Sequence, residues 1–316
     1  MAQLSIAVFG TGAAGGYFGG RLAEAGEDVR FIARGAHLAA MRAHGLTVAS
    51  VAGDFRLDPV RVTDDPATVG PVDVVLLGVK AWQVSAAAEA MRPLVGERTF
   101  VVPLQNGIEA PEQLAAVLGP KRVLGGLCSI LASLEGPGRI RHMGVTPTIA
   151  FGELDGPASA RAEALREAFA RTRGVSAEVP ADIRAAMWNK FLFITALSGV
   201  GAVTRAPAGV IRSLPETRGL LRQALEEIYA LAGRAGIALP ADTVERTLAF
   251  IDGLPPDGTT SLQRDVLQAR PSELEAQVGA VVRLGGRLGM EVPVHRMLYA
   301  VLLPLERRAR GELSWA

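Results

Sequence analysis

The sequence predicts an α/β protein in which a doubly wound, mostly parallel sheet is followed by an all-α C-terminal domain. Its first half alternates short β-branched runs with helical stretches, a pattern typical of a parallel sheet covered by helices. Beyond Pro180 only helical patterns remain. At 316 residues the chain is also longer than most single domains. We therefore expect two domains, residues 1–180 and residues 181–316.

The first half begins with a buried-strand run, followed by a helix and a second strand. Val72–Val79 is uniformly apolar, as a central parallel strand should be, and Leu46–Leu57 alternates like a hairpin broken at Gly53. Runs between Ser129 and Val179 are shorter, and we expect them to add antiparallel strands to the edge of the sheet. The expected strands are Leu4–Phe9, Asp28–Ala33, Val72–Val79, Thr99–Val102, Val123–Leu127, Ile130–Leu134, Arg139–His142 and Thr148–Gly152, and the expected helices are Ala13–Ala25, Gly35–His44 and Ala158–Thr172.

The second half shows apolar residues at helical spacing only. Two of these helical segments, Leu220–Ala232 and Val278–Leu288, are apolar enough to pack either within one chain or between two copies. The sequence is therefore compatible with a homodimer. The expected helices are Ala181–Val203, Pro215–Ala235, Ala241–Ile251, Pro271–Leu288 and Val294–Arg310.

Composition narrows the class of protein. A hydrophobic fraction of 49% and a charged fraction of 21% are typical of a globular protein, and the net charge of +1 favours neither nucleic acid nor an anionic membrane as partner. The single cysteine, Cys128, excludes an internal disulfide, and the four histidines lack metal-ligand spacing, so no metal is expected. No signal-peptide pattern or long apolar span is present. We expect a cytoplasmic protein.

A glycine-rich turn directly follows the first predicted strand and opens the first predicted helix. In a G-x-G-x-x-G turn the first glycine permits a tight bend, the second lets the backbone approach a pyrophosphate, and the third lets the helix pack on the strand. The N–H groups at the start of the helix then face the phosphates. This context predicts a Rossmann-type dinucleotide site, the alternative being a ligand-free turn. The turn consists of Gly10, Thr11, Gly12, Ala13, Ala14 and Gly15.

The end of the second predicted strand discriminates between nicotinamide cofactors. A site for NAD usually carries a carboxylate there, whereas this chain has Ala33 followed by Arg34. An arginine at this position is suited to pair with a 2′-phosphate. The sequence therefore favours NADP(H), with an ordinary solvated loop arginine as the alternative.

Lysine and asparagine are rare in this chain, and their positions are informative. Of three lysines, Lys80 ends an apolar strand and Lys190 lies in an apolar helical run. Asn106, one of only two asparagines, follows the next strand. Ligands of doubly wound sheets bind at the carboxyl ends of the strands, where Lys80 and Asn106 are expected. A partly desolvated lysine can release a proton, which arginine cannot, so Lys190 is a candidate proton donor; a snorkelling lysine is the alternative.

Together these motifs resemble the ketopantoate reductase (2-dehydropantoate 2-reductase) family over nearly the whole chain. The resemblance implies a Rossmann domain followed by an all-helical substrate or dimerisation domain, with the active site in the cleft between them. It also implies NADPH-dependent reduction of ketopantoate to D-pantoate, a step of pantothenate biosynthesis. The matching segments are the glycine turn, Arg34, Val79–Gln83, Gln105–Gly107, Trp188–Lys190, Ser261 and Arg270–Glu275.

The resemblance also implies roles for individual residues. A lysine matching Lys190 is the general acid, a glutamate matching Glu273 holds the substrate and tunes that lysine, and a serine matching Ser261 contacts the substrate. Residues matching Lys80 and Asn106 lie between nicotinamide and substrate. The chemistry agrees, because hydride transfer to a ketone develops negative charge on oxygen, which an ammonium stabilises and protonates. Taken alone, Glu273 also suits a helix start, where Ser272 and Glu275 resemble a capping box.

Departures from the family pattern bear on the substrate. Members commonly carry asparagines one and two turns beyond the catalytic lysine, where this chain has Ile194 and Ser198, and Ala208 replaces a third. Positions four and eight residues along a helix share its face, so Ile194 and Ser198 are expected to line the pocket. An amide lost there removes a hydrogen bond of about 0.5–1.5 kcal/mol. These departures favour, as an alternative, a reductase of a different small 2-oxo acid or ketone. A separate alternative is a non-catalytic NADP(H)-binding protein that kept the fold.

Overall fold

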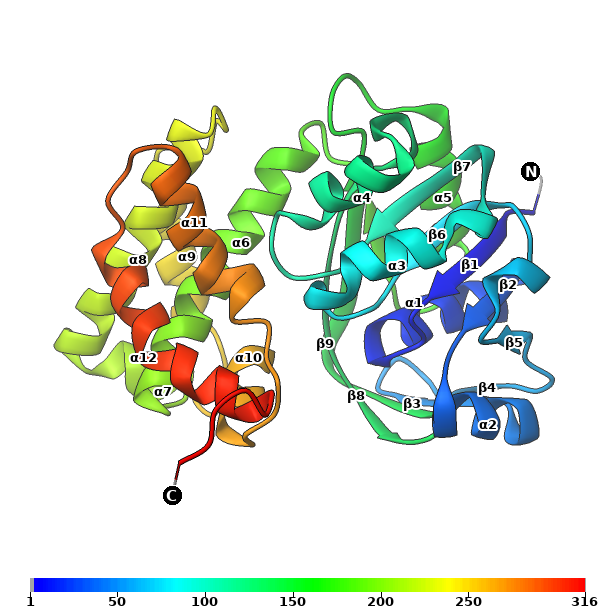
Figure 1. Cartoon of the computed structure of the whole chain (residues 1–316), viewed down its shortest axis with the longest axis horizontal. Coiled ribbons are helices and arrows are strands. Elements are labelled where there is room, and N and C mark those ends of the chain that lie inside the picture. The colour runs from blue at the N-terminus through cyan, green and yellow to red at the C-terminus, as the bar shows by residue number, and fades with distance from the viewer. Residues whose placement is uncertain (1–2, 316) are drawn as a thin grey trace. The chain divides into compact units, whose positions relative to one another are not determined.

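The computed structural model describes residues 3–315, and the chain divides into two compact units (Figure 1). The N-terminal unit contains the chain up to Gln105 together with Ala110–Ile183. The helical unit contains Asn106–Glu109 together with the chain from Arg184 onward. The short segment Asn106–Glu109 thus packs with the helical unit although it lies far from the rest of that unit in sequence.

Five parallel strands form the central sheet of the N-terminal unit, which confirms the predicted fold class. Their order is β5-β2-β1-β6-β7, with β1 in the middle. Ile6, Ala7 and Val8 of β1 are all 0% exposed, because a central strand is covered on both faces. The strands are β1 (Ser5–Phe9), β2 (Asp28–Ile32), β5 (Val62–Thr63), β6 (Val72–Leu77) and β7 (Val95–Pro103).

Helices cover both faces of this sheet. Successive residues of a strand point to opposite faces. Accordingly Ile6 and Val8 join one apolar cluster with α1 and α5, while Ala7 and Phe9 join another with α3 and α4. The helices are α1 (Ala13–Glu24), α2 (Gly35–His44), α3 (Val84–Ala90), α4 (Ala110–Leu118) and α5 (Ala160–Ala170), with short 3₁₀ turns η1 (Pro66–Thr68), η2 (Ala81–Gln83), η3 (Arg92–Leu94) and η4 (Pro120–Arg122).

A second sheet replaces the expected antiparallel additions to the central sheet, so that prediction is wrong. The long strand β9 pairs antiparallel with β8, and parallel with β3 near its start and β10 near its end. Its inward residues Ile140, Ile149 and Phe151 pack in the cluster of α1 and α5, so the hairpin covers those helices instead of extending the first sheet. The strands are β3 (Leu46–Ser50), β4 (Phe55–Leu57), β8 (Gly125–Gly136), β9 (Arg139–Gly152) and β10 (Ser176–Glu178).

The helical unit is built around α6. Phe191, Leu192 and Val200 of this helix are at most 1% exposed. By length and composition α6 is apolar enough to cross a membrane, but 67% of its most apolar window is buried in the protein, as in the core helix of a globular domain. The helices are α6 (Ile183–Thr204), α7 (Ala208–Ser213), α8 (Pro215–Arg234), α9 (Thr243–Asp252), α10 (Ser261–Leu267), the π-helical η5 (Glu275–Gly279), α11 (Ala280–Arg287) and α12 (Pro293–Ala309).

The helix expected over Pro271–Leu288 begins later than predicted. Residues 271–274 are irregular, and Glu275 starts the π-helical turn η5, which leads into α11. The Ser272 hydroxyl accepts from Leu274 N and donates to Glu306, while Glu275 binds Arg283 and Tyr299. A capping box of Ser272 and Glu275 is therefore not formed, and Glu273 lies on a bend and not in a helix.

Candidate active site

The glycine turn has the tight geometry that its sequence predicts. Gly10 has φ +95°, and a Cβ there would lie 2.7 Å from Val79 N; a Cβ on Gly15 would lie 2.3 Å from Gly10 O. The N–H groups of Gly10 and Thr11 both donate to Ile32 O, and the Thr11 hydroxyl donates to the same carbonyl at 3.0 Å. The turn is thus held against the carboxyl end of β2.

The start of α1 leaves its N–H groups available to a ligand. Gly12 is the N-cap residue and offers no side chain to cap the helix, and no acidic residue lies in the first turn, where Ala13 and Ala14 are half-buried. Free N–H groups at a helix start form a binding site for phosphate. A further glycine that the sequence reading missed, Gly78, contributes to this turn, since a Cβ on it would lie 2.6 Å from Gly10 O.

Arg34 lies two residues after the end of β2, at the N-cap of α2, and its side chain is exposed. Within residues 3–315 its guanidinium forms no ion pair with a carboxylate. Gly35, with φ +56°, turns the chain into the helix immediately afterwards. An exposed, unpaired arginine at the end of β2 is the arrangement expected for binding an additional phosphate of a dinucleotide.

His37, on the first turn of α2, connects the glycine turn to the β8–β9 hairpin. Its Nδ1 accepts from Gly138 N at 3.0 Å, and its Nε2 is enclosed by protein. Burial lowers the pKa of His37 below its usual value, and the nearby Thr11 carbonyl opposes that shift. The ring is therefore held neutral, with Nδ1 as acceptor. Sequence reading assigned His37 no role, because its partners come from distant segments.

Lys80 follows β6 and is exposed. Its backbone N–H donates to Gln83 at 3.2 Å, and its Nζ lies 5.7 Å from the centre of the Trp82 ring, a cation–π distance. The buried Gln105 amide donates to both Leu77 O and Val79 O at 2.8 Å. Gln105 thereby fixes the end of β6 and the residues between it and Lys80.

The helical unit carries the other predicted site residues. Lys190 is half-buried on α6, and Ile194 and Ser198 follow one and two turns later. Ser261 begins α10 and is half-buried, next to the N-cap residue Thr260. Ala208, which we expected to replace a family asparagine, is 1% exposed and so is packed as a core residue at the start of α7.

Two hydroxyls on α6 are buried without hydrogen-bond partners among the described residues. They belong to Thr195 and Ser198, both 0% exposed. A buried hydroxyl without a partner costs free energy, so such groups are usually satisfied by water or a ligand. Ser198 was predicted as a pocket residue, whereas Thr195 was not.

Asn106 and Glu273 meet within the helical unit. The Asn106 amide donates to the Glu273 carboxylate at 3.3 Å, and Glu273 is only 8% exposed. The sequence reading selected both residues separately, and the structure brings them together. A buried carboxylate with an amide donor beside it can orient a small polar ligand or a cationic side chain.

The bend that carries Glu273 is anchored by a buried network that was not predicted. Glu306, 3% exposed, accepts from Ser272 N at 3.0 Å, from the Ser272 hydroxyl at 2.5 Å and from Arg310 Nε at 2.7 Å. Arg310 also donates to Ser272 O at 3.1 Å. No local sequence signal points to this network, because Ser272 and Glu306 lie on separate elements.

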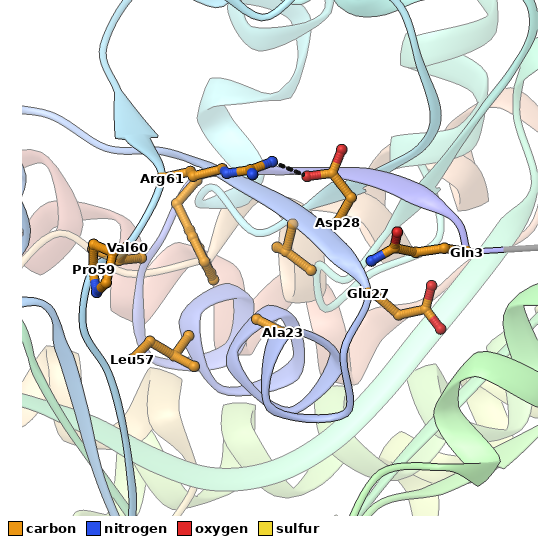
Figure 2. A pocket seen from close by; sticks show the side chains of 10 residues that line it. Gln3, Ala23, Glu27, Asp28, Leu57, Pro59, Val60 and Arg61 are labelled. Carbon is orange, nitrogen blue, oxygen red and sulfur yellow. Dashed lines mark hydrogen bonds and ion pairs between the residues drawn. The ribbon is translucent and has the colours of Figure 1, made fainter.

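A hollow of about 350 Å³ in the N-terminal unit is not the predicted site (Figure 2). It lies beside the amino end of β2, and none of the predicted residues lines it. Its two carboxylates already have partners, since Asp28 pairs with Arg61 at 2.6 Å and Glu27 pairs with Arg171. Among residues 3–315, no group of three or more His, Cys, Asp and Glu side chains is placed to hold a metal ion.

Comparison with known proteins identifies the family. The model of the ketopantoate reductase PanE/ApbA family matches residues 6–156, and that of its C-terminal domain matches residues 182–306. The chain is 30% identical to an uncharacterized oxidoreductase, YkpB, of Bacillus subtilis, with 95% of this chain and 98% of that protein covered. It is also 30% identical to a 2-dehydropantoate 2-reductase of Nostoc sp., with 99% of both covered.

A solved structure agrees with this similarity. The 2-dehydropantoate 2-reductase of Geobacter metallireducens superposes with a TM-score of 0.88 at 33% identity, covering 94% of this chain and 98% of that one. The chain belongs to the ketopantoate reductase family and is a nicotinamide-dependent oxidoreductase.

Proposed function

We propose that the protein reduces ketopantoate to D-pantoate with NADPH in the cytoplasm, as a step of pantothenate biosynthesis. The observation that carries the proposal is the Asn106–Glu273 hydrogen bond, because it pairs two predicted site residues in the unit that also carries Lys190. The names of the relatives support the substrate.

NADP(H) fits the residues of the N-terminal unit. The close backbone packing at Gly10 and Gly15 and the uncapped start of α1 suit a pyrophosphate, and the exposed Arg34 suits a 2′-phosphate. In the proposal these residues hold the cofactor, with Lys80 near its reactive end. When bound, NADPH supplies the hydride.

Lys190 supplies the proton in this proposal. As the ketone is reduced, negative charge develops on its oxygen, and the Lys190 ammonium stabilises that charge and then protonates the oxygen. Glu273 and Asn106 orient the substrate and the lysine, while Ser261 and Ser198 offer hydroxyls to the substrate. A hydroxyl as deeply buried as that of Ser198 discriminates strongly, because an analogue that cannot pair with it leaves it unsatisfied.

The test is steady-state NADPH oxidation with ketopantoate by the parent and by Lys190→Ala. General acid catalysis contributes about a hundredfold to ten-thousandfold, and we expect kcat to fall by that factor. Lys121→Ala is the matched control, because Lys121 is an exposed lysine on η4, in the N-terminal unit. Full activity of Lys190→Ala would remove the proposed mechanism.

A second candidate substrate is a less hydroxylated 2-oxo acid or ketone. Ile194, half-buried one turn beyond Lys190, and the buried Ala208 favour it, because neither offers the amide that the family's asparagines supply. The measurement is kcat/KM with NADPH for ketopantoate and for a panel of simple 2-oxo acids. If several of these are reduced at least as efficiently as ketopantoate, the second candidate replaces the first.

A further inference from the structure

The segment Asn106–Glu109 runs directly against η5 inside the helical unit. Gly107 has φ +106°, and a Cβ on it would lie 2.6 Å from Ala276 O, so the two backbones approach as closely as only glycine allows. Ile108 packs on the apolar core of the unit. The position of Asn106 is therefore set by how this segment sits on η5.

Arg283, on α11, bridges the far end of that segment to η5. It donates to the Glu109 carboxylate at 2.8 Å, to the Glu275 carboxylate at 2.7 Å and to the Glu275 carbonyl at 2.7 Å. Gly279 leaves room for this arrangement, because a Cβ there would lie 2.8 Å from Glu275 Oε2 and 3.1 Å from Arg283. We call Arg283, Glu109 and Glu275 the arginine bridge.

Tyr299, on α12, also binds the Glu275 carboxylate and fixes its orientation. Its hydroxyl donates to Glu275 at 2.5 Å, and burial together with this hydrogen bond raises the pKa of Tyr299 to about 12. Glu275 is thereby held in one orientation from two sides. Each contact alone is partly exposed and weak, but together they fix the direction of the Arg283 fork.

The arginine bridge lies beside the two residues that the proposed reaction uses. Glu109 is three residues from Asn106 along one backbone, and Glu275 is two residues from Glu273 along the other. The Asn106–Glu273 bond, at 3.3 Å, is longer than a typical N–H···O bond and tolerates little further separation. Without Arg283, the Glu109 and Glu275 carboxylates would repel each other and push the segment away from η5.

We propose that Arg283 is a positioning residue: by binding Glu109 and Glu275 it holds Asn106 against Glu273. The hydrogen bonds of Arg283 to the described residues go to Glu109 and Glu275, so in this proposal it acts through the backbones that carry Asn106 and Glu273. The inference rests on the proposed function in so far as Asn106 and Glu273 act on substrate.

The first experiment measures steady-state kinetics of Arg283→Gln, Arg283→Lys and the control Arg287→Ala. Arg287 is an exposed arginine on the same helix. Displacing catalytic groups by about 1 Å can cost about a hundredfold, so we expect Arg283→Gln to lower kcat/KM for the 2-oxo acid by about tenfold to a hundredfold. The KM for NADPH should change less than the KM for the 2-oxo acid, because the glycine turn and Arg34 hold the cofactor in the proposed function. Arg283→Lys should recover part of the loss. Arg283→Gln kinetics equal to those of Arg287→Ala would overturn the inference.

A double-mutant cycle tests whether Arg283 acts through Glu109. If it does, Arg283→Gln combined with Glu109→Gln should be no worse than Arg283→Gln alone. Fully additive losses would contradict the bridge. Thermal unfolding of each variant separates a folding defect from a positioning defect.

Hydrogen exchange gives a readout that does not depend on the substrate. The backbone amides of residues 106–109 should exchange faster in Arg283→Gln than in the parent and in Arg287→Ala. If the parent fails to reduce ketopantoate while this difference is present, the proposed function fails and the bridge stands. Unchanged exchange in Arg283→Gln would overturn the bridge itself.

Discussion

Replacing Glu306 by alanine should destabilise the helical unit and free the bend that carries Glu273. The Glu306 carboxylate is 3% exposed and accepts from the backbone and hydroxyl of Ser272 and from Arg310. Ser272 is 0% exposed, so its N–H and hydroxyl cannot turn to water in the variant. Arg310, with a side chain 23% exposed, can regain solvent.

The magnitude follows from these exposures. A hydrogen bond to a charged group contributes about 1.5–3 kcal/mol, and removing one partner of a buried ion pair costs about 3–5 kcal/mol. The two Ser272 donors left unpaired place the loss of stability within that range. Because Arg310 is partly solvated and can regain water, we expect the lower part of the range. The free energy of unfolding of Glu306→Ala should fall by about 3–4 kcal/mol.

Urea unfolding followed by circular dichroism measures this change. Glu291→Ala is the matched control, because the Glu291 side chain is 80% exposed and pairs with the exposed Arg296. Glu306→Gln keeps the shape of the side chain and one acceptor oxygen. Its loss in the free energy of unfolding should lie between those of Glu306→Ala and Glu291→Ala. A loss below about 1 kcal/mol for Glu306→Ala, the range of a surface pair, would refute the reasoning.

Two further predictions concern the N-terminal unit. Arg34→Ala should remove most of the preference for NADPH over NADH, because an unpaired guanidinium after β2 is the group expected to bind a 2′-phosphate. The measurement is the ratio of the kcat/KM values for the two cofactors. A parent without this preference, or a variant that keeps it, would contradict the assignment. Burial lowers the pKa of His37, so as the pH falls the unfolded chain takes up its proton first. The free energy of unfolding should therefore decrease as the pH drops below the ordinary histidine pKa of 6.5 and through the lower pKa of the folded state. His37→Asn should flatten that dependence in a pH series of urea titrations, whereas the same change at the exposed His44 should not. Equal slopes for both variants would argue against a lowered pKa of the half-buried His37.

Local patterns predicted the central sheet and the glycine turn. The apolar run of β6, the G-x-G-x-x-G spacing and the absence of a carboxylate after β2 all act within a few residues, where backbone conformation follows from residue type. The second sheet was missed because β9 pairs with β3, β8 and β10, and such pairings depend on which faces remain to be covered. The helix predicted over Pro271–Leu288 was started too early, because Ser272 binds Glu306 and does not cap a helix.

The sequence by itself determined the fold class and the candidate residues, since rare lysines and asparagines stand out in a chain that otherwise uses arginine. Only the tertiary structure decided that Asn106 donates to Glu273, 167 residues away, and that Arg283 bridges the segments carrying them. Contacts over such distances arise from packing of the whole unit, which no local pattern encodes. The candidate residues of the proposed site are thus visible in the sequence, whereas the contacts that bring them together come from the fold.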